Sequence, residues 1–211
     1  MEFWSSLLTE KSWNLLKELS KKDFQFILIG GWAAYLWTKL HKSKDIDIIV
    51  PDFKGLEYLK KNYDLRKNDS LKRYEIKFEE IDVDIYVPYY SKLALPVEEI
   101  KSHITKIENM QVVSPEILLI LKQGAELERK DSVKGSKDRV DIMALLLFSE
   151  MDFKKYNSLL EKHNLKHYFD RLFWIITNFD GIKYLELNPR EFKLRKRELL
   201  GKMGKKNKKS S

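Results

Sequence analysis

The stretch from Ile27 to Val50, ILIGGWAAYLWTKLHKSKDIDIIV, constrains the fold of this 211-residue chain more than any other. An apolar run ends at Gly30-Gly31, an apolar helical segment follows, and a second apolar run carries Asp45 and Asp47. This order predicts a strand, a packed helix and a second strand. Residues i and i+2 of a strand point to the same face, so the two carboxylates repel each other unless a cation neutralises them. A hard divalent ion, Mg²⁺ or Mn²⁺, is the cation that such oxygen ligands prefer.

The run IDVDIYVP repeats this pattern, with Asp82 and Asp84 on the face opposite its apolar residues. If this strand lies beside the strand of Asp45 and Asp47, a third carboxylate joins the first two. Three carboxylates can hold two ions, one that activates a nucleophile and one that holds a triphosphate. The alternative for either pair alone is the solvent-exposed face of an edge strand. Two such pairs in one chain favour the metal site.

The Gly30-Gly31 turn fits the same chemistry, because glycine lets the backbone approach a phosphate closely. The N-terminus of the following helix offers free N–H groups and the positive end of its dipole. A Gly-Gly pair without other features is more often a tight turn than an anion site. The pair therefore contributes to the interpretation only together with the aspartates.

The rest of the chain predicts an α+β fold in which strands and helices are mixed up to about residue 108. Helices are expected over residues 9–22 and 53–62, and residues 71–88 read as a hairpin that turns near Glu79-Glu80. A short strand pair is expected over 104–114, and helices from Pro115 to about residue 180. We therefore expect a core over residues 1–108, a helical domain over 109–188 and a basic tail over 189–211.

The composition excludes several classes of protein. The chain has no cysteine, so a disulfide framework, a thiolate zinc site and a thiol nucleophile are excluded. No apolar run approaches the ~20 residues that a membrane-spanning helix needs, so no membrane partner is expected. The N-terminal residues MEFWSSLLTEKSW lack the pattern of a secretory signal, which predicts a cytoplasmic protein.

The positive charge is concentrated at the C-terminal end. Residues 190–211 contain ten basic and two acidic residues, which accounts for the whole formal net charge of +8. This composition predicts a disordered tail. It is equally consistent with an arm that contacts RNA phosphates and with a solvated end that keeps the protein in solution.

Two sets of motifs resemble a known superfamily. Gly30-Gly31, thirteen intervening residues, Asp45-Ile46-Asp47 and the later VDIYVP strand with Asp84 resemble the signature of the DNA polymerase β-like nucleotidyltransferases. The stretch from Ser114 to Leu146 is similar to the downstream region of AbiEii-type nucleotidyltransferases, the toxin-side enzymes of abortive-infection toxin–antitoxin systems. Relatives usually carry Arg and Ser/Thr shortly before the aspartates, where this chain has Lys42 and Ser43.

The resemblance implies a nucleotidyltransferase-type mixed β-sheet with flanking helices, followed by a helical C-terminal domain. It implies an Mg²⁺-dependent (or Mn²⁺-dependent) enzyme that transfers NMP from an NTP to a hydroxyl of RNA, tRNA or protein, with a cognate antitoxin as a partner. The residues that it assigns to catalysis and metal binding are Asp45, Asp47 and Asp84. Those that it assigns to the nucleotide are Gly30, Gly31, Ser43, Lys122, Lys137 and Asp138.

The residues themselves leave alternatives open in the second motif. Lys122 could meet a triphosphate as a point charge, or extend past the edge of its helix into solvent. Asp138 and Asp141, at i and i+3, could orient Lys122, contact the nucleotide, or pair with Lys134 and Arg139 at the surface.

The alternative function is a nucleotidyltransferase-fold protein without activity, which acts as a nucleic-acid-binding or toxin–antitoxin partner module. The presence of all three aspartates argues against it, because a degenerate site usually loses one.

Overall fold

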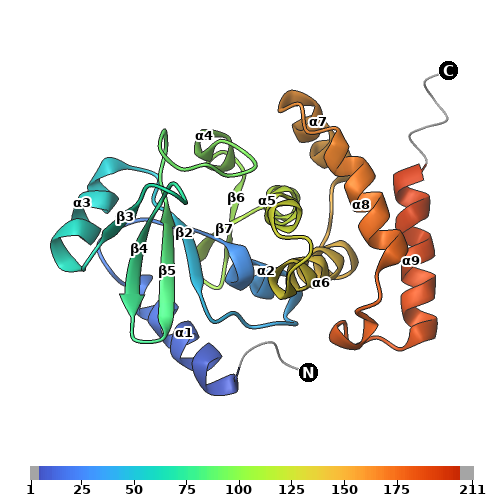
Figure 1. Ribbon diagram of the computed structural model, residues 1–211, viewed down its shortest axis with the longest axis horizontal. Coiled ribbons are helices and arrows are strands. Elements are labelled where there is room, and N and C mark those ends of the chain that lie inside the picture. The colour runs from blue at the N-terminus through green and yellow to red at the C-terminus, as the bar shows by residue number, and fades with distance from the viewer. Residues whose placement is uncertain (1–4, 205–211) are drawn as a thin grey trace.

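The computed structural model describes residues 5–204 and shows a mixed β-sheet with helices around it and beyond one edge (Figure 1). Within this range one seven-stranded sheet has the order β3-β4-β5-β2-β1-β7-β6. The pairs β2–β5 and β1–β7 are parallel, and the other neighbouring pairs are antiparallel. The strands are β1 (Ile27–Ile29), β2 (Ile46–Ile49), β3 (Arg66–Asn68), β4 (Arg73–Phe78), β5 (Ile81–Tyr86), β6 (Ile104–Ile107) and β7 (Met110–Val113).

The helices divide into those that flank the sheet and those that extend from it. In Figure 1, α5 and α6 lie beside the strands, and α7, α8 and α9 lie beyond them on the side away from the sheet. The described helices are α1 (Ser6–Leu19), α2 (Gly30–Thr38), α3 (Phe53–Asn62), α4 (Val97–Ile100), α5 (Pro115–Glu128), α6 (Val133–Phe148), α7 (Phe153–Lys162), α8 (His167–Asn178) and α9 (Pro189–Gly204), with a 3₁₀ turn at Ile182–Tyr184.

The core lies between the sheet and these helices, and α2 is at its centre. Trp32 of α2 is fully buried, and its indole N–H donates a hydrogen bond to the Ser12 hydroxyl of α1. The ring of Trp13 packs against Trp32, with 4.9 Å between the ring centroids. Because α2 also contacts α5 and α6, it connects the sheet to the helical part of the chain.

The predicted α+β class, the mixed sheet and the helical C-terminal part are confirmed. The predicted hairpin is also present, since β4 and β5 pair in antiparallel register around a turn at Glu79-Glu80. The expected boundary between residues 108 and 109 falls inside the β6–β7 hairpin, and β7 extends the sheet beside β1. The short elements β3 and α4 were not predicted, because they are too short to show a periodic pattern.

The expectation of a disordered tail from residue 189 is wrong for residues 189–204, which form helix α9. Three apolar side chains of this segment, Phe192, Leu199 and Met203, are buried. Their spacing places them on one face, which packs against α6 and α8. The many basic residues on the other faces hide this pattern in the composition. The prediction for residues 205–211 lies outside the described residues.

Candidate active site

A cleft of about 740 Å³ opens between the sheet and helices α5 and α6. Strands β2, β4 and β5 supply one wall, and the opposite wall comes from α5, α6 and the start of α2. All the site residues that the sequence predicted line this one cleft: Gly30, Gly31, Ser43, Asp45, Asp47, Asp84, Lys122, Lys137 and Asp138. They come from segments as far apart as residues 30 and 138, so only the fold brings them together.

The carboxylates form a row across neighbouring strands. The parallel pairing of β2 with β5 places Asp47 directly opposite Asp84. The antiparallel pairing of β5 with β4 places Glu75 opposite Asp84 on its other side. Residues that are opposite each other in a sheet share a face, so these three acidic side chains lie abreast and Asp45 precedes them on the same face.

Burial and the repulsion of neighbouring carboxylates raise the pKa values of Asp84 and Asp45. Burial and the neighbouring Asp47 raise the pKa of Asp84 to about 8, although Arg73 opposes the shift. Burial also raises the pKa of Asp45. The negative charges of Asp47 and Asp82 raise this pKa further, and the positive charge of Lys44 lowers it. Among the described residues, the Oδ1 atoms of Asp45 and Asp84 are buried and accept no hydrogen bond. Arg73 and Lys44 therefore do not fully offset the burial and mutual repulsion of these two carboxylates.

Arg73 is the functional candidate that the sequence analysis missed. Its Nη1 lies 2.7 Å from Oδ2 of Asp84, and its Nε lies 2.8 Å from Oε1 of Glu75. It also hydrogen-bonds to the hydroxyl of Tyr86. The strand RYEIKF contained a usable signal, since the predicted hairpin puts Arg73 and Glu75 on the same face as Asp84.

The two glycines of the turn are required by the close approach of Asp47 to Gly30 and of Ser43 to Gly31. Gly30 has a φ of +66°, and a Cβ atom there would lie 2.0 Å from Oδ2 of Asp47. A Cβ atom on Gly31 would lie 2.4 Å from the Ser43 hydroxyl and 3.6 Å from Nζ of Lys137. The two glycines thus let Asp47, Ser43 and Lys137 approach the start of α2, whose first turn has no side-chain cap.

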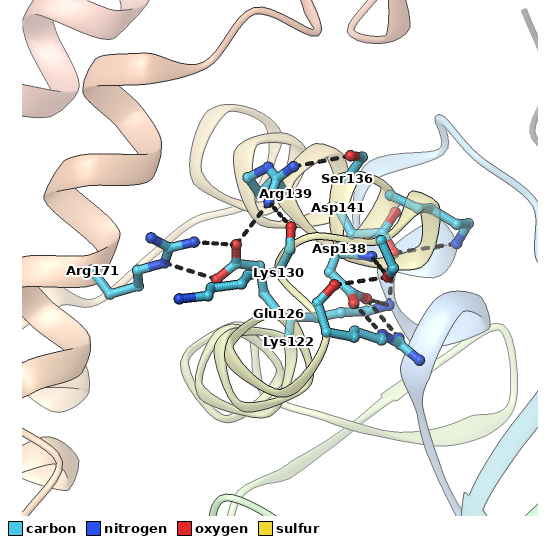
Figure 2. A network of polar contacts seen from close by, with 12 residues as sticks. Lys122, Glu126, Lys130, Ser136, Asp138, Arg139, Asp141 and Arg171 are labelled. Atoms are coloured by element: carbon cyan, nitrogen blue, oxygen red, sulfur yellow. Dashed lines mark hydrogen bonds and ion pairs between the residues drawn. The ribbon is translucent and has the colours of Figure 1, made fainter.

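Lys122 is buried rather than extended into solvent, and two buried aspartates of α6 hold it (Figure 2). Its Nζ lies 2.7 Å from Oδ2 of Asp141 and 3.5 Å from Oδ1 of Asp138. Arg129 donates to both oxygens of Asp138, and Lys137 approaches Asp141 at 3.3 Å. Burial would raise the pKa of Asp141, but Lys122 and Lys137 lower it below its usual value.

The surface alternative for Asp138 and Asp141 is therefore wrong, since both are buried and bind the cations that surround the cleft. Arg139 pairs instead with Glu126 of α5, at 2.9 Å. Glu126 is fully buried and also accepts two hydrogen bonds from Arg171 of α8 (Figure 2). Sequence reasoning did not find this second cluster, because its members become neighbours only when the three helices pack.

Within residues 5–204, no three His, Cys, Asp or Glu side chains are gathered closely enough to form a metal-binding group on their own. Over the same residues, no helix is long and apolar enough to cross a membrane.

The mixed sheet and its flanking helices have the fold of solved structures that are described as nucleotidyltransferases. A candidate nucleotidyltransferase from Helicobacter pylori has this fold, with 19% identity, a TM-score of 0.50, and coverage of 96% of this chain and 97% of that one. ANT(2″)-Ia, solved in complex with adenylyl-2″-tobramycin, is 13% identical over 77% of this chain and 99% of its own, with a TM-score of 0.51. No protein-family model and no curated protein sequence matches the chain. These likenesses are of fold.

Proposed function

We propose that the protein is a nucleotidyltransferase that moves NMP from an NTP to an acceptor hydroxyl and releases pyrophosphate. The observation that supports this most is the carboxylate row on β2 and β5, which shares one cleft with the uncapped start of α2. The solved structure of ANT(2″)-Ia, which has a similar fold, is a complex with adenylyl-2″-tobramycin, and this likeness supports the proposal. In-line transfer requires negative groups that bind cations beside donors that bind phosphate, and the cleft brings the two kinds together.

A divalent cation, Mg²⁺ or Mn²⁺, fits the carboxylate face by its chemistry. The available ligands are hard oxygens, and two of them, one on Asp45 and one on Asp84, are buried without a hydrogen bond in the described structure. Mg²⁺ is usually bound through one or two carboxylates together with substrate phosphates and waters, so a closed cage of protein ligands is not needed. In this proposal Asp45, Asp47 and Asp84 hold the metal together with phosphate oxygens of the nucleotide, which would complete a coordination that the three carboxylates do not provide on their own. When bound, the metal would supply the positive charge that an incoming triphosphate requires.

The chain's own groups have separate tasks in this proposal. Asp84 accepts a proton from the acceptor hydroxyl, because it lies in the cleft directly opposite Asp47. Gly30, Gly31 and Ser43 bring the start of α2 to the phosphates. Lys137 lies beside this turn and contacts them as a point charge. Lys122 and Asp138 form the floor of the nucleotide site beneath it.

The acceptor and the partners are proposed from the motif resemblance. We propose RNA, tRNA or a protein hydroxyl as the acceptor, and a toxin–antitoxin role with a cognate antitoxin as the partner. The basic residues of α9 favour RNA among these acceptors, because cations exposed along a helix attract phosphates.

The test is incubation of the protein with Mg²⁺ and each labelled NTP, with and without total tRNA, followed by detection of labelled acceptor. We expect transfer by the wild type and none by Asp45→Ala/Asp47→Ala. The control is Asp64→Ala, because Asp64 pairs with Arg66 in an exposed ion pair outside the carboxylate row. Thermal melting of each variant separates loss of chemistry from loss of fold.

Two outcomes would contradict the proposal. Transfer that survives the double substitution would remove Asp45 and Asp47 from the chemistry. A folded wild type that transfers none of the nucleotides, to tRNA or to protein, would favour the inactive binding module. The observation that favours this alternative is the ion pair between Arg73 and Asp84, because it occupies one oxygen of a proposed metal ligand.

A further inference from the structure

Arg73 holds the position of a cation at the centre of the carboxylate row. Its guanidinium bridges Asp84 and Glu75, at 2.7 Å and 2.8 Å, and three quarters of its side chain is shielded from solvent. It is therefore a positive charge that allows Asp84 and Glu75 to lie side by side on neighbouring strands. An arginine in a partly buried, forked contact of this kind interacts strongly with its carboxylates.

The protein engages only one of the two carboxylate oxygens of Asp84. Its Oδ1 is buried and has no hydrogen-bond partner in the described part of the chain. Its other oxygen, Oδ2, is occupied by Arg73. A divalent ion that binds Asp84 would thus compete with Arg73 for one of its two carboxylate oxygens.

We propose, on the basis of the nucleotidyltransferase function above, that Arg73 is a positioning residue that competes with the divalent ion for Asp84. In the metal-free cleft it holds Asp84 through Oδ2, and it must release this oxygen before Asp84 can bind a metal. Glu75 keeps its own contact to Nε, so the guanidinium remains in the cleft after the release. Asp84 would therefore bind a metal more tightly when a nucleotide is present, because phosphate oxygens would supply the coordination that one occupied carboxylate oxygen withholds.

Electrostatics determines the direction of the expected effect. Removing a positive charge a few ångströms from a cation site strengthens cation binding, whereas damage to the fold weakens it. Competition therefore predicts a gain of metal affinity on substitution of Arg73, which a merely structural role would not produce.

The experiment is titration of metal-free protein with Mn²⁺, with free Mn²⁺ followed by electron paramagnetic resonance. Without nucleotide, we expect Arg73→Gln to lower the Mn²⁺ dissociation constant by roughly tenfold. With a non-hydrolysable NTP present, the Mn²⁺ dissociation constants of the variant and the wild type should differ less. Arg73→Lys keeps the charge but not the fork, and should fall between the two.

The matched control is Arg66→Gln, because Arg66 lines the same cleft but pairs with Asp64 instead of Asp84. We expect it to change the Mn²⁺ dissociation constant by less than about twofold, since exposed charges are screened. Equal or weaker Mn²⁺ binding by both Arg73 variants would overturn the competition. A wild type that binds no Mn²⁺, with or without nucleotide, would instead contradict the metal dependence of the proposed function.

Discussion

The ammonium nitrogen of Lys122 lies 2.7 Å from Oδ2 of Asp141, and both side chains are buried between α5 and α6. Burial alone would lower the pKa of Lys122, but Asp141 and Asp138 raise it above its usual value. The pair is therefore charged in the folded protein. The desolvation cost of two buried charges is offset by their attraction for each other, so either one left alone is expensive.

Substitution Lys122→Met should destabilise the protein by about 3–5 kcal/mol, because it leaves Asp138 and Asp141 buried with less positive charge. The measurement is the free energy of unfolding in urea at neutral pH. The control is Lys60→Met, an exposed lysine of α3, which should change that free energy by less than about 0.5 kcal/mol. A loss equal to that of the control would mean that Lys122 is dispensable for the fold.

The carboxylate of Glu126 should be a second point of high sensitivity. It pairs with Arg139 and Arg171 and has no exposure to solvent. Glu126→Gln should therefore lower the free energy of unfolding by about 2–4 kcal/mol. Glu128 is on the same helix and exposed, and Glu128→Gln serves as the control with almost no expected change. Similar urea midpoints for the two variants would show that this cluster does not join α8 to α5.

The glycine at the start of α2 should not tolerate a side chain. In Gly30→Ala the new Cβ atom would overlap the Asp47 carboxylate, and the positive φ adds strain, so we expect a loss of about 1–3 kcal/mol and of any transfer activity. Gly201 in α9 is the matched control, because nothing lies within 4 Å of its added Cβ atom. Gly201→Ala should stabilise the helix by about 0.5–1 kcal/mol. Thermal melting should show a lower melting temperature for Gly30→Ala and a higher one for Gly201→Ala than for the wild type. A stable, active Gly30→Ala would refute the close approach of Asp47.

Some of this site follows from local pattern and some from packing. The strand alternation places Asp45 and Asp47 on one face, and the apolar run that ends at Gly30 predicts the turn, because both depend on neighbouring residues only. The predicted sheet then needs only the order of two strands to bring Asp84 beside Asp47. Their catalytic roles stay predictions.

The remaining features depend on contacts between distant segments. Glu126 and Arg171 are 45 residues apart, and no local pattern shows that α8 packs against α5. The burial of Lys122 also depends on a distant segment. Its helix, α5, is amphipathic enough for an exposed lysine, and the side chain is buried only because α6 packs over it. In α9 the composition was misleading, because a high count of basic residues concealed an apolar face.

The raised pKa of Asp84 gives stability a definite dependence on pH. A carboxyl group whose pKa is about 8 in the folded protein and ~3.9 in the unfolded chain binds protons more tightly when folded. Its contribution to stability is full below pH ~4 and is lost as the pH rises towards 8. We expect the free energy of unfolding to fall over this window in the wild type and to fall less in Asp84→Asn. Urea unfolding at several pH values, without divalent ions, measures both slopes, and equal slopes would contradict the shift.

Helix α9 should be held by its apolar face and not by its charges. Phe192 is 5% exposed and packs against Phe179, with 5.8 Å between the ring centroids. Phe192→Ala should therefore cost about 3–5 kcal/mol if α9 unfolds together with the rest of the chain. Leu194 on the same helix is 47% exposed, so Leu194→Ala should cost less than about 1 kcal/mol. Hydrogen exchange of the α9 amides completes the measurement. Fast exchange in Phe192→Ala with an unchanged global unfolding transition would show that α9 opens separately. Slow exchange in both variants would mean that the basic faces of α9 hold it in place.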